Sequence, residues 1–147
     1  MRLNQWLEGI EYQVIQGKIN IDVTDVVYDS RKVVKGVVFI CIKGINIDSH
    51  DFIDECVEKG ANVLIVERNI KPISKDVTVI QVQNTRKAMA LLSAARFDHP
   101  LKKMISIGIT GTKGKTTTTY MIKAMLESAG KKVGLIGTAG AMIGDQL

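Results

Sequence analysis

One stretch near the C-terminal end of the chain combines glycine, lysine and threonine in an order that suits phosphate binding. It reads Gly111-Thr112-Lys113-Gly114-Lys115-Thr116-Thr117 and follows an apolar run at residues 104–109. Glycines let the backbone turn its N–H groups toward an anion, Lys115 can reach terminal phosphates, and Thr116 can offer a hydroxyl to Mg²⁺. The pattern therefore predicts a nucleotide site of the phosphate-loop type.

The match to the common Gly-x4-Gly-Lys-Ser/Thr pattern is incomplete. Ile109 stands where that pattern has its first glycine, and glycines occupy positions 108 and 111 instead. The alternative is an ordinary strand-to-helix turn, but such a turn has no need for the run Gly-Lys-Thr-Thr, so we favour the phosphate loop. Partition-type ATPases carry an extra lysine where Ile109 stands, and that class is therefore disfavoured.

Composition limits the classes of protein that fit. The chain has 147 residues, of which 46% are hydrophobic and 24% charged, as in globular proteins. The net charge is +5, yet the lysines are scattered, so we expect a small anionic substrate rather than a nucleic acid. No apolar run approaches the roughly 20 residues of a membrane span, and no secretory signal is evident. We expect a cytoplasmic protein with no membrane partner.

The first 99 residues predict a small α/β domain. Nearly continuous apolar runs indicate strands that are covered on both faces, and apolar residues at helical spacing indicate helices. The expected strands are 26–28, 37–42, 62–66 and 77–82, and the expected helices are 3–7, 51–59 and 85–97, the last capped by Asn84. We place the domain boundary at Asp98-His99-Pro100, because the residue before a proline resists the helical conformation.

Residues 100–147 predict the start of a second domain. A strand at 104–109, the loop, a helix at 115–129 and a strand at 133–136 would form the first βαβ unit of a phosphate-loop domain. The helix is expected to turn Tyr120, Met121, Met125 and Leu126 inward. Such a unit needs further strands to cover its sheet, and few residues follow position 136, so we expect the chain to be a truncated piece.

Three stretches, taken together, resemble the Mur ligase family of bacterial cell-wall synthesis. The first stretch starts at residues 29–33 and includes the segments 36–40, 43–44, 48–53 and 60–61. The second stretch is residues 109–117, and the third is residues 130–138. The resemblance implies an N-terminal domain that binds the UDP part of a UDP-muramoyl peptide, followed by a central domain that binds ATP and Mg²⁺. It covers most of the chain.

The resemblance also implies site residues. At the ATP site it places Gly111, Thr112, Gly114, Lys115, Thr116 and Thr117, with Lys115 as the catalytic residue and Thr116 as the Mg²⁺ ligand. Lys113 joins them where the family usually has asparagine, either adding charge near the phosphates or pointing to solvent. At the uridine site it places Ser30, Arg31, Ile45, Asn46 and Ile47. For Asp29 and Ser30, a turn that satisfies its own backbone remains an alternative.

The implied reaction joins a diamino acid to UDP-MurNAc-L-Ala-D-Glu through an acyl phosphate, at the expense of ATP. Residues 130–138 favour this branch over the one that adds D-Ala-D-Ala to a UDP-MurNAc-tripeptide, and Thr116 disfavours a folylpolyglutamate synthetase. A non-catalytic nucleotide-binding module remains open. The full-length protein would be a monomeric, cytoplasmic ligase for peptidoglycan, cell shape and division. No carboxylate follows residues 133–136 before Asp145, so we expect this chain to be inactive alone.

Overall fold

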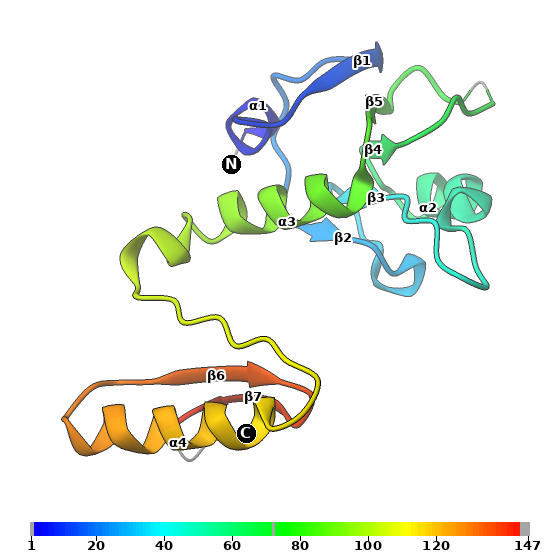
Figure 1. The fold of residues 1–147 in the computed structure, drawn as a ribbon. Coiled ribbons are helices and arrows are strands. Elements are labelled where there is room, and N and C mark those ends of the chain that lie inside the picture. Colours follow the sequence, from blue (N-terminus) through cyan, green and yellow to red (C-terminus); the bar gives the residue numbers. More distant parts are fainter. Residues whose placement is uncertain (1, 72, 145–147) are drawn as a thin grey trace. The chain divides into compact units, whose positions relative to one another are not determined.

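The computed structural model describes residues 2–71 and 73–144. The chain divides into two compact units, Met1–Met104 and Ile105–Leu147. Among these described residues, the first unit contains a five-stranded sheet with helices, and the second contains one α-helix and a two-stranded sheet (Figure 1). Within the described ranges, no helix is both long enough and apolar enough to cross a membrane.

The sheet of the first unit is mixed. Its strands are β1 (Tyr12–Gln16), β2 (Val26–Val27), β3 (Val38–Ile40), β4 (Val63–Val66) and β5 (Thr78–Val82), in the spatial order β1-β5-β4-β3-β2. Strands β2 to β5 pair in parallel, and β1 pairs antiparallel with β5 at one edge. All parallel strands therefore end at the same edge of the sheet, which is where ligands bind in open α/β sheets.

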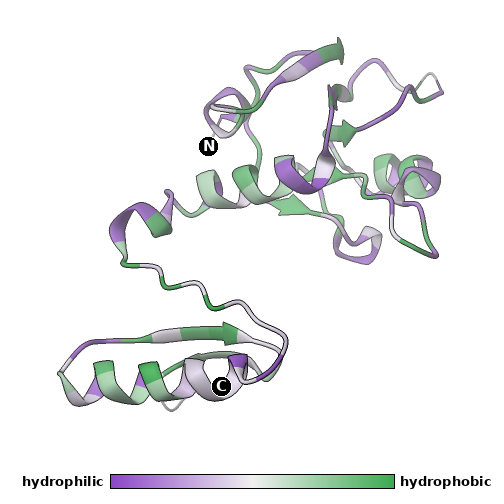
Figure 2. Cartoon of the chain, in the orientation of Figure 1, coloured by the Kyte–Doolittle hydropathy of each residue, from purple (hydrophilic) through white to green (hydrophobic). Residues whose placement is uncertain are grey.

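Both faces of this sheet are covered, because successive side chains of a strand point to opposite faces. On one face Ile40, Ile65 and Ile80 pack with residues of α1 (Leu3–Trp6) and α3 (Thr85–Arg96). On the other face Phe39 and Leu64 pack with residues of α2 (Ile53–Glu58). The apolar colouring of the strands in Figure 2 matches these two cores. The result is a layered α/β unit, which confirms the predicted α/β fold class.

The predicted strands and helices of this unit are present, with boundaries shifted by a few residues. Helix α3 begins where expected, because the Asn84 side chain accepts a hydrogen bond from the Lys87 backbone N–H at 2.8 Å. Strand β1 was not predicted. Its residues are mostly exposed and include two glutamines, so its sequence lacks the apolar run of a buried strand.

Helix α3 ends by a different geometry from the one predicted. The expectation was an extended residue before Pro100, but Asp98 and His99 both lie in the left-handed region, with φ of 56° and 49°. The His99 N–H donates to the Ala94 carbonyl at 2.7 Å and the Asp98 N–H donates to the Ala95 carbonyl at 3.1 Å. These two bonds satisfy carbonyl groups that the helix end leaves free, which explains why left-handed backbone replaces the extended form.

The second unit contains α4 (Lys115–Ser128), β6 (Gly134–Gly137) and β7 (Gly140–Ile143). Strands β6 and β7 form an antiparallel hairpin. The strand predicted at 104–109 is not formed, and Ile105 and Ile107 are exposed. A strand requires a hydrogen-bonded neighbour, and among the described residues β6 pairs with β7 and not with this segment. The first strand of the predicted βαβ unit is therefore absent from this structure.

The predicted inner face of α4 was largely wrong. Tyr120, Met121 and Met125 are exposed, while Leu126 is half-buried and Lys123 is buried. The Lys123 amine pairs with the Glu127 carboxylate at 2.7 Å. Among the described residues of this unit, α4 packs mainly against β6, so Tyr120, Met121 and Met125 stay exposed on the helix.

Candidate functional site

The phosphate loop, residues 111–117, contains two glycines with backbone conformations that other residues rarely adopt. Gly111 has φ of 150° and Gly114 has φ of 76°. Gly114 is also the residue that caps the N-terminus of α4. A side chain at either position would strain the backbone, so the loop geometry itself explains why glycine stands at both.

The first turn of α4 leaves backbone donors free at this loop. The first helical hydrogen bond runs from the Thr118 N–H to the Gly114 carbonyl at 2.9 Å. The N–H groups of Lys115, Thr116 and Thr117 therefore have no acceptor within the helix. Free N–H groups and the positive end of the helix dipole make this turn suitable for an anion.

The lysine amine lies over the loop. Lys115 donates from Nζ to the Gly111 carbonyl oxygen at 2.5 Å, and Thr119 donates from Oγ1 to the Lys115 carbonyl at 2.6 Å. The amine and the free N–H groups therefore belong to one short segment, residues 111–117. Thr112, Lys113 and Thr117 are exposed, and Lys113 makes no hydrogen bond or ion pair with any residue that the structure describes.

Thr116 is the residue that could contribute to a Mg²⁺ site. Its hydroxyl is a hard oxygen donor, the type that Mg²⁺ prefers, and the residue is exposed in the first turn of α4. Within the described ranges there is no group of three or more His, Cys, Asp and Glu residues that could hold a metal ion. Asp145 lies outside the described residues. The chain thus fits Mg²⁺ held by one hydroxyl together with nucleotide phosphates.

The second set of predicted site residues follows the parallel strands of the first unit. Ser30 and Arg31 come after β2, and Ile45, Asn46 and Ile47 come after β3. Strands β2 and β3 are parallel neighbours, so both segments leave the sheet at its carboxyl edge. The structure therefore brings the predicted uridine residues to the edge where such sheets bind ligands.

The turn after β2 is held by Asp29. Its Oδ1 accepts from the Arg31 backbone N–H at 3.0 Å, and its Oδ2 accepts from the Arg31 guanidinium at 2.7 Å. The side-chain hydrogen bond from Arg31, followed by the backbone one, lowers the pKa of Asp29 to about 2. The same hydrogen bond raises the pKa of Arg31.

The arrangement of this turn assigns different roles to its residues. Asp29 accepts a hydrogen bond from the backbone N–H of its own turn, as expected if Asp29 and Ser30 form a turn that satisfies its own backbone. Arg31 is occupied by Asp29 in this structure. The Ser30 hydroxyl makes no hydrogen bond with the described residues, while the Ser30 carbonyl accepts from Lys59 Nζ at 3.3 Å. Ser30 is therefore the residue of this turn that can offer a hydroxyl to a ligand.

Residues 44–47, which we call the uridine loop after the predicted role of Ile45, Asn46 and Ile47, form a tight turn at the end of a short ladder. The Gly44 N–H donates to the Ile47 carbonyl at 2.8 Å, and Lys43 and Asp48 form an antiparallel bridge. A Cβ at position 44 would lie 2.8 Å from the Ile47 carbonyl oxygen, so glycine is required there. Ile45 and Ile47 are exposed. Two exposed apolar side chains beside a polar sheet edge suit contact with a flat base.

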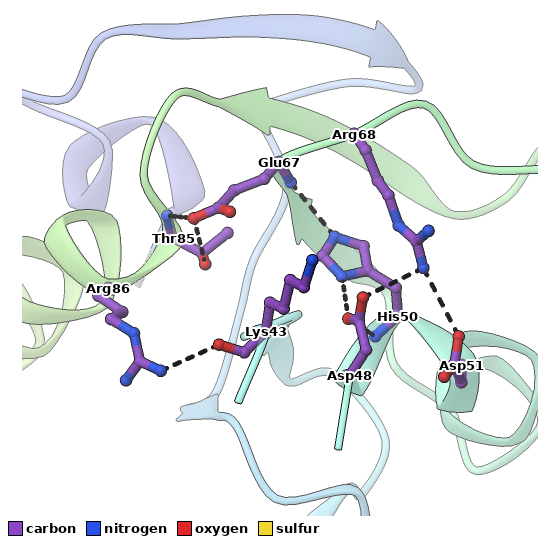
Figure 3. Close-up of polar contacts among 8 residues, drawn as sticks. All are labelled: Lys43, Asp48, His50, Asp51, Glu67, Arg68, Thr85 and Arg86. Atoms are coloured by element: carbon purple, nitrogen blue, oxygen red, sulfur yellow. Dashed lines mark hydrogen bonds and ion pairs between the residues drawn. The ribbon is translucent and has the colours of Figure 1, made fainter. Parts of the chain in front are cut away.

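Sequence reasoning missed a polar network at the base of this loop (Figure 3). Asp48 Oδ1 accepts from the His50 backbone N–H at 3.0 Å and lies 2.6 Å from His50 Nδ1. His50 Nε2 accepts from the Glu67 backbone N–H at 3.3 Å, so these partners assign the ring proton to Nδ1. Burial raises the pKa of Asp48, but the hydrogen bonds from His50 and the charge of Arg68 outweigh it and lower the pKa overall.

The network continues into α3. Glu67 Oε1 accepts from the Thr85 backbone N–H at 2.6 Å and from the Thr85 hydroxyl at 2.9 Å. Arg86 donates from its guanidinium to the Lys43 carbonyl at 3.0 Å. Glu67 directly follows β4, and Thr85 lies just beyond β5. The rule that parallel strands gather polar residues at their carboxyl ends could have identified both.

Comparison with protein families gives two matches. Residues 22–97 match the model described as "Mur ligase family, catalytic domain", and residues 109–146 match the "Mur ligase middle domain". The first match covers more than half of the chain. The two matches lie on the two structural units that carry the uridine loop and the phosphate loop.

Individual proteins agree with these matches. The chain is 48% identical over 146 residues to the UDP-N-acetylmuramoyl-L-alanyl-D-glutamate–2,6-diaminopimelate ligase 1 of Clostridium acetobutylicum, covering 99% of this chain and 30% of that protein. A solved diaminopimelate ligase structure covers the whole chain and 29% of its own, with a TM-score of 0.73 at 20% identity, and this similarity supports the fold alone. MurF from Thermotoga maritima, solved with ADP, gives a TM-score of 0.54 at 30% identity, covering 75% of this chain and 24% of that one.

Proposed function

The chain belongs to the Mur ligase family, and from that premise we propose that the whole protein is an ATP-dependent ligase of the MurE type. It would add a diamino acid to UDP-MurNAc-L-Ala-D-Glu in peptidoglycan synthesis, within the cytoplasm and as a monomer. The chain spans about 30% of the length of the curated relatives it matches. The activity is therefore proposed for the whole protein, to which this chain contributes two nucleotide-binding regions.

The proposed division of labour follows the two units. Residues 1–99 would bind the UDP-sugar, and residues 100–147 would begin the ATP-binding domain. The observation that carries the ATP assignment is the geometry of the phosphate loop, with the Lys115 amine over the loop beside three free N–H groups. This arrangement is what a triphosphate requires, because it supplies both positive charge and directed donors.

In the proposed reaction, the terminal carboxylate of the UDP-muramoyl dipeptide takes the γ-phosphoryl group of ATP, which releases ADP and gives an acyl phosphate. The α-amine of the diamino acid then attacks the acyl carbon, forms the amide bond and releases inorganic phosphate and a proton. Lys115 would bind the transferring phosphoryl oxygens, and the N–H groups of Lys115, Thr116 and Thr117 would orient them. Thr116 would hold Mg²⁺ through its hydroxyl. Mg²⁺, when bound, neutralises charge on the phosphate oxygens.

At the other site, Ser30 would hydrogen-bond the uracil or ribose, and the loop with Ile45, Asn46 and Ile47 would contact the base. The free hydroxyl of Ser30 and the exposed side chains of the loop support this assignment. Arg31 could reach the diphosphate only by leaving Asp29, so we assign it a smaller role than Ser30.

Two branches of the family remain to be compared. Curated diaminopimelate ligases are 42–48% identical to this chain over 86–100% of its length. Solved MurF structures are 29–30% identical to it, and one solved diaminopimelate ligase is 20% identical. The curated relatives support the diamino acid branch over addition of D-Ala-D-Ala.

Separate titrations of UDP-MurNAc-L-Ala-D-Glu and of ATP with Mg²⁺ into the 147-residue chain test the proposal. We expect both ligands to bind, and to do so independently, by isothermal titration calorimetry. We expect no ATP turnover, because the part of the chain that the structure describes offers no carboxylate cluster for a second metal contact. Absence of binding by either ligand would remove the corresponding site from the proposal.

A further inference from the structure

The base of the uridine loop is held at both ends by residues from other parts of the sheet (Figure 3). At one end, Arg86 of α3 donates to the Lys43 carbonyl at 3.0 Å. At the other end, Asp48 accepts from His50 and pairs with the Arg68 guanidinium at 3.3 Å. The two ends of the loop are thus fastened to α3 and to the segment that follows β4.

The loop itself has few contacts that would keep it in one conformation. Its internal bonds are the Gly44 N–H to Ile47 carbonyl bond and the bridge between Lys43 and Asp48. Ile45 is fully exposed, so no packing restrains the tip. A loop of this kind gains its order from its base, and a ligand that meets an ordered loop loses less conformational entropy on binding.

We propose that Arg86 is a positioning residue for the nucleotide-sugar site. By holding the Lys43 carbonyl it keeps residues 44–47 in the ligand-binding conformation before the ligand arrives. The inference rests on the proposed function, which places the uridine at this loop. The Arg86–Lys43 hydrogen bond is exposed, so its removal should alter the loop far more than the stability of the domain.

The test uses the 147-residue chain with UDP as the probe. Arg86→Ala removes the contact, Arg86→Lys keeps a donor without the planar guanidinium, and Lys87→Ala is the matched control. Lys87 is the next residue of α3, carries the same charge and makes no side-chain hydrogen bond or ion pair with the loop as the structure describes it. Two quantities are measured: the Kd for UDP, and the hydrogen-exchange rates of the Gly44 and Ser49 amides in the ligand-free protein.

We expect Arg86→Ala to weaken UDP binding about tenfold, equivalent to about 1.4 kcal/mol. Exchange at Gly44 and Ser49 should accelerate in the same variant, because both amides close hydrogen bonds at the loop base. Arg86→Lys should recover part of the affinity, and Lys87→Ala should change it less than twofold. Unfolding midpoints should stay within a few degrees of one another. Should Arg86→Ala not fold, Arg86→Gln carries the same test.

The outcomes separate this inference from the function on which it rests. If the unaltered chain does not bind UDP, the uridine site is wrong. If it binds UDP and Arg86→Ala binds equally well, the positioning role is overturned and the uridine site stands. A loss of affinity with unchanged loop exchange would also overturn it, because Arg86 would then contact the ligand directly.

Discussion

The two candidate nucleotide regions rest on very different amounts of tertiary structure. The uridine region lies at the carboxyl edge of a sheet covered on both faces, and its contacts join residues far apart in the chain. The phosphate loop is held by contacts within a few residues, such as Lys115 to Gly111 and Thr118 to Gly114. A loop that binds phosphate, a group common to all nucleotides, needs only local backbone geometry. A site that recognises one particular nucleoside needs side chains from several segments held close together.

The largest effect should come from the core under the uridine region. Phe39 of β3 is fully buried and packs in the same core as α2, and Phe39→Ala should lower the free energy of unfolding by about 3–5 kcal/mol. Urea unfolding followed by circular dichroism measures this change, and UDP binding should fail with it.

A matched substitution in the second unit checks whether the effect is local to the core. Ile105 is almost completely exposed, so Ile105→Ala should change stability by less than about 0.5 kcal/mol. Similar losses of unfolding free energy in Phe39→Ala and Ile105→Ala would contradict the claim that the first region depends on a packed core and the second does not.

The next effect concerns the phosphate loop. Lys115→Ala removes the amine that faces the loop, and the loss of a charged hydrogen bond of about 1.5–3 kcal/mol should weaken ATP binding about 10- to 100-fold. The unfolding midpoint should not move, since the residue is exposed. Calorimetric titration with ATP and Mg²⁺ gives the affinity.

Lys113→Asn is the control for that experiment. The Lys113 side chain makes no hydrogen bond or ion pair with the described residues, so we expect its replacement to change ATP affinity less than threefold, roughly 0.6 kcal/mol. A large loss would show that Lys113 faces the phosphates. An unfolded Lys115→Ala protein would contradict the claim that the loop is independent of the fold.

A smaller effect concerns left-handed backbone, which occurs both in the phosphate loop and at the end of α3. The phosphate loop places glycine at its left-handed position, Gly114, but α3 ends with Asp98 at φ of 56°. Asp98→Gly should be more stable than Asp98→Ala by about 1 kcal/mol, because only glycine adopts this conformation without a steric cost. Both variants lose the Lys103 ion pair, so their difference in thermal unfolding isolates the backbone. Equal stabilities would argue against a left-handed end for α3.

The smallest effect is the pH dependence of the turn at Asp29. Because the pKa of Asp29 lies at about 2 in the folded turn, below its usual 3.8, the Asp29–Arg31 contact stabilises the turn above about pH 4. That contribution disappears as the pH falls through 2. Carbon NMR of the Asp29 carboxyl should show the lowered pKa, and Arg31→Ala should restore the usual value. Residues 111–117 contain no carboxylate and should not respond.

Much of this architecture could be predicted from the sequence. The runs that became β3 and β4 are wholly apolar, the run that became β5 is rich in β-branched residues, and Asn84 marks the start of α3, so local patterns were sufficient. Strand β1 escaped notice because an edge strand with exposed glutamines has no such pattern. The strand expected at 104–109 did not form, because the pattern records a tendency to pair but not the presence of a neighbour.

The sequence alone determined the pattern of the phosphate loop and most of the strands and helices of the first unit, because each depends on residues close together in the chain. Only the tertiary structure decided that Arg86 meets Lys43 and that His50 joins Asp48 to the backbone of Glu67. These contacts form when parallel strands place their carboxyl ends side by side. The spacing of residues along the chain carries no information about which of those ends become neighbours.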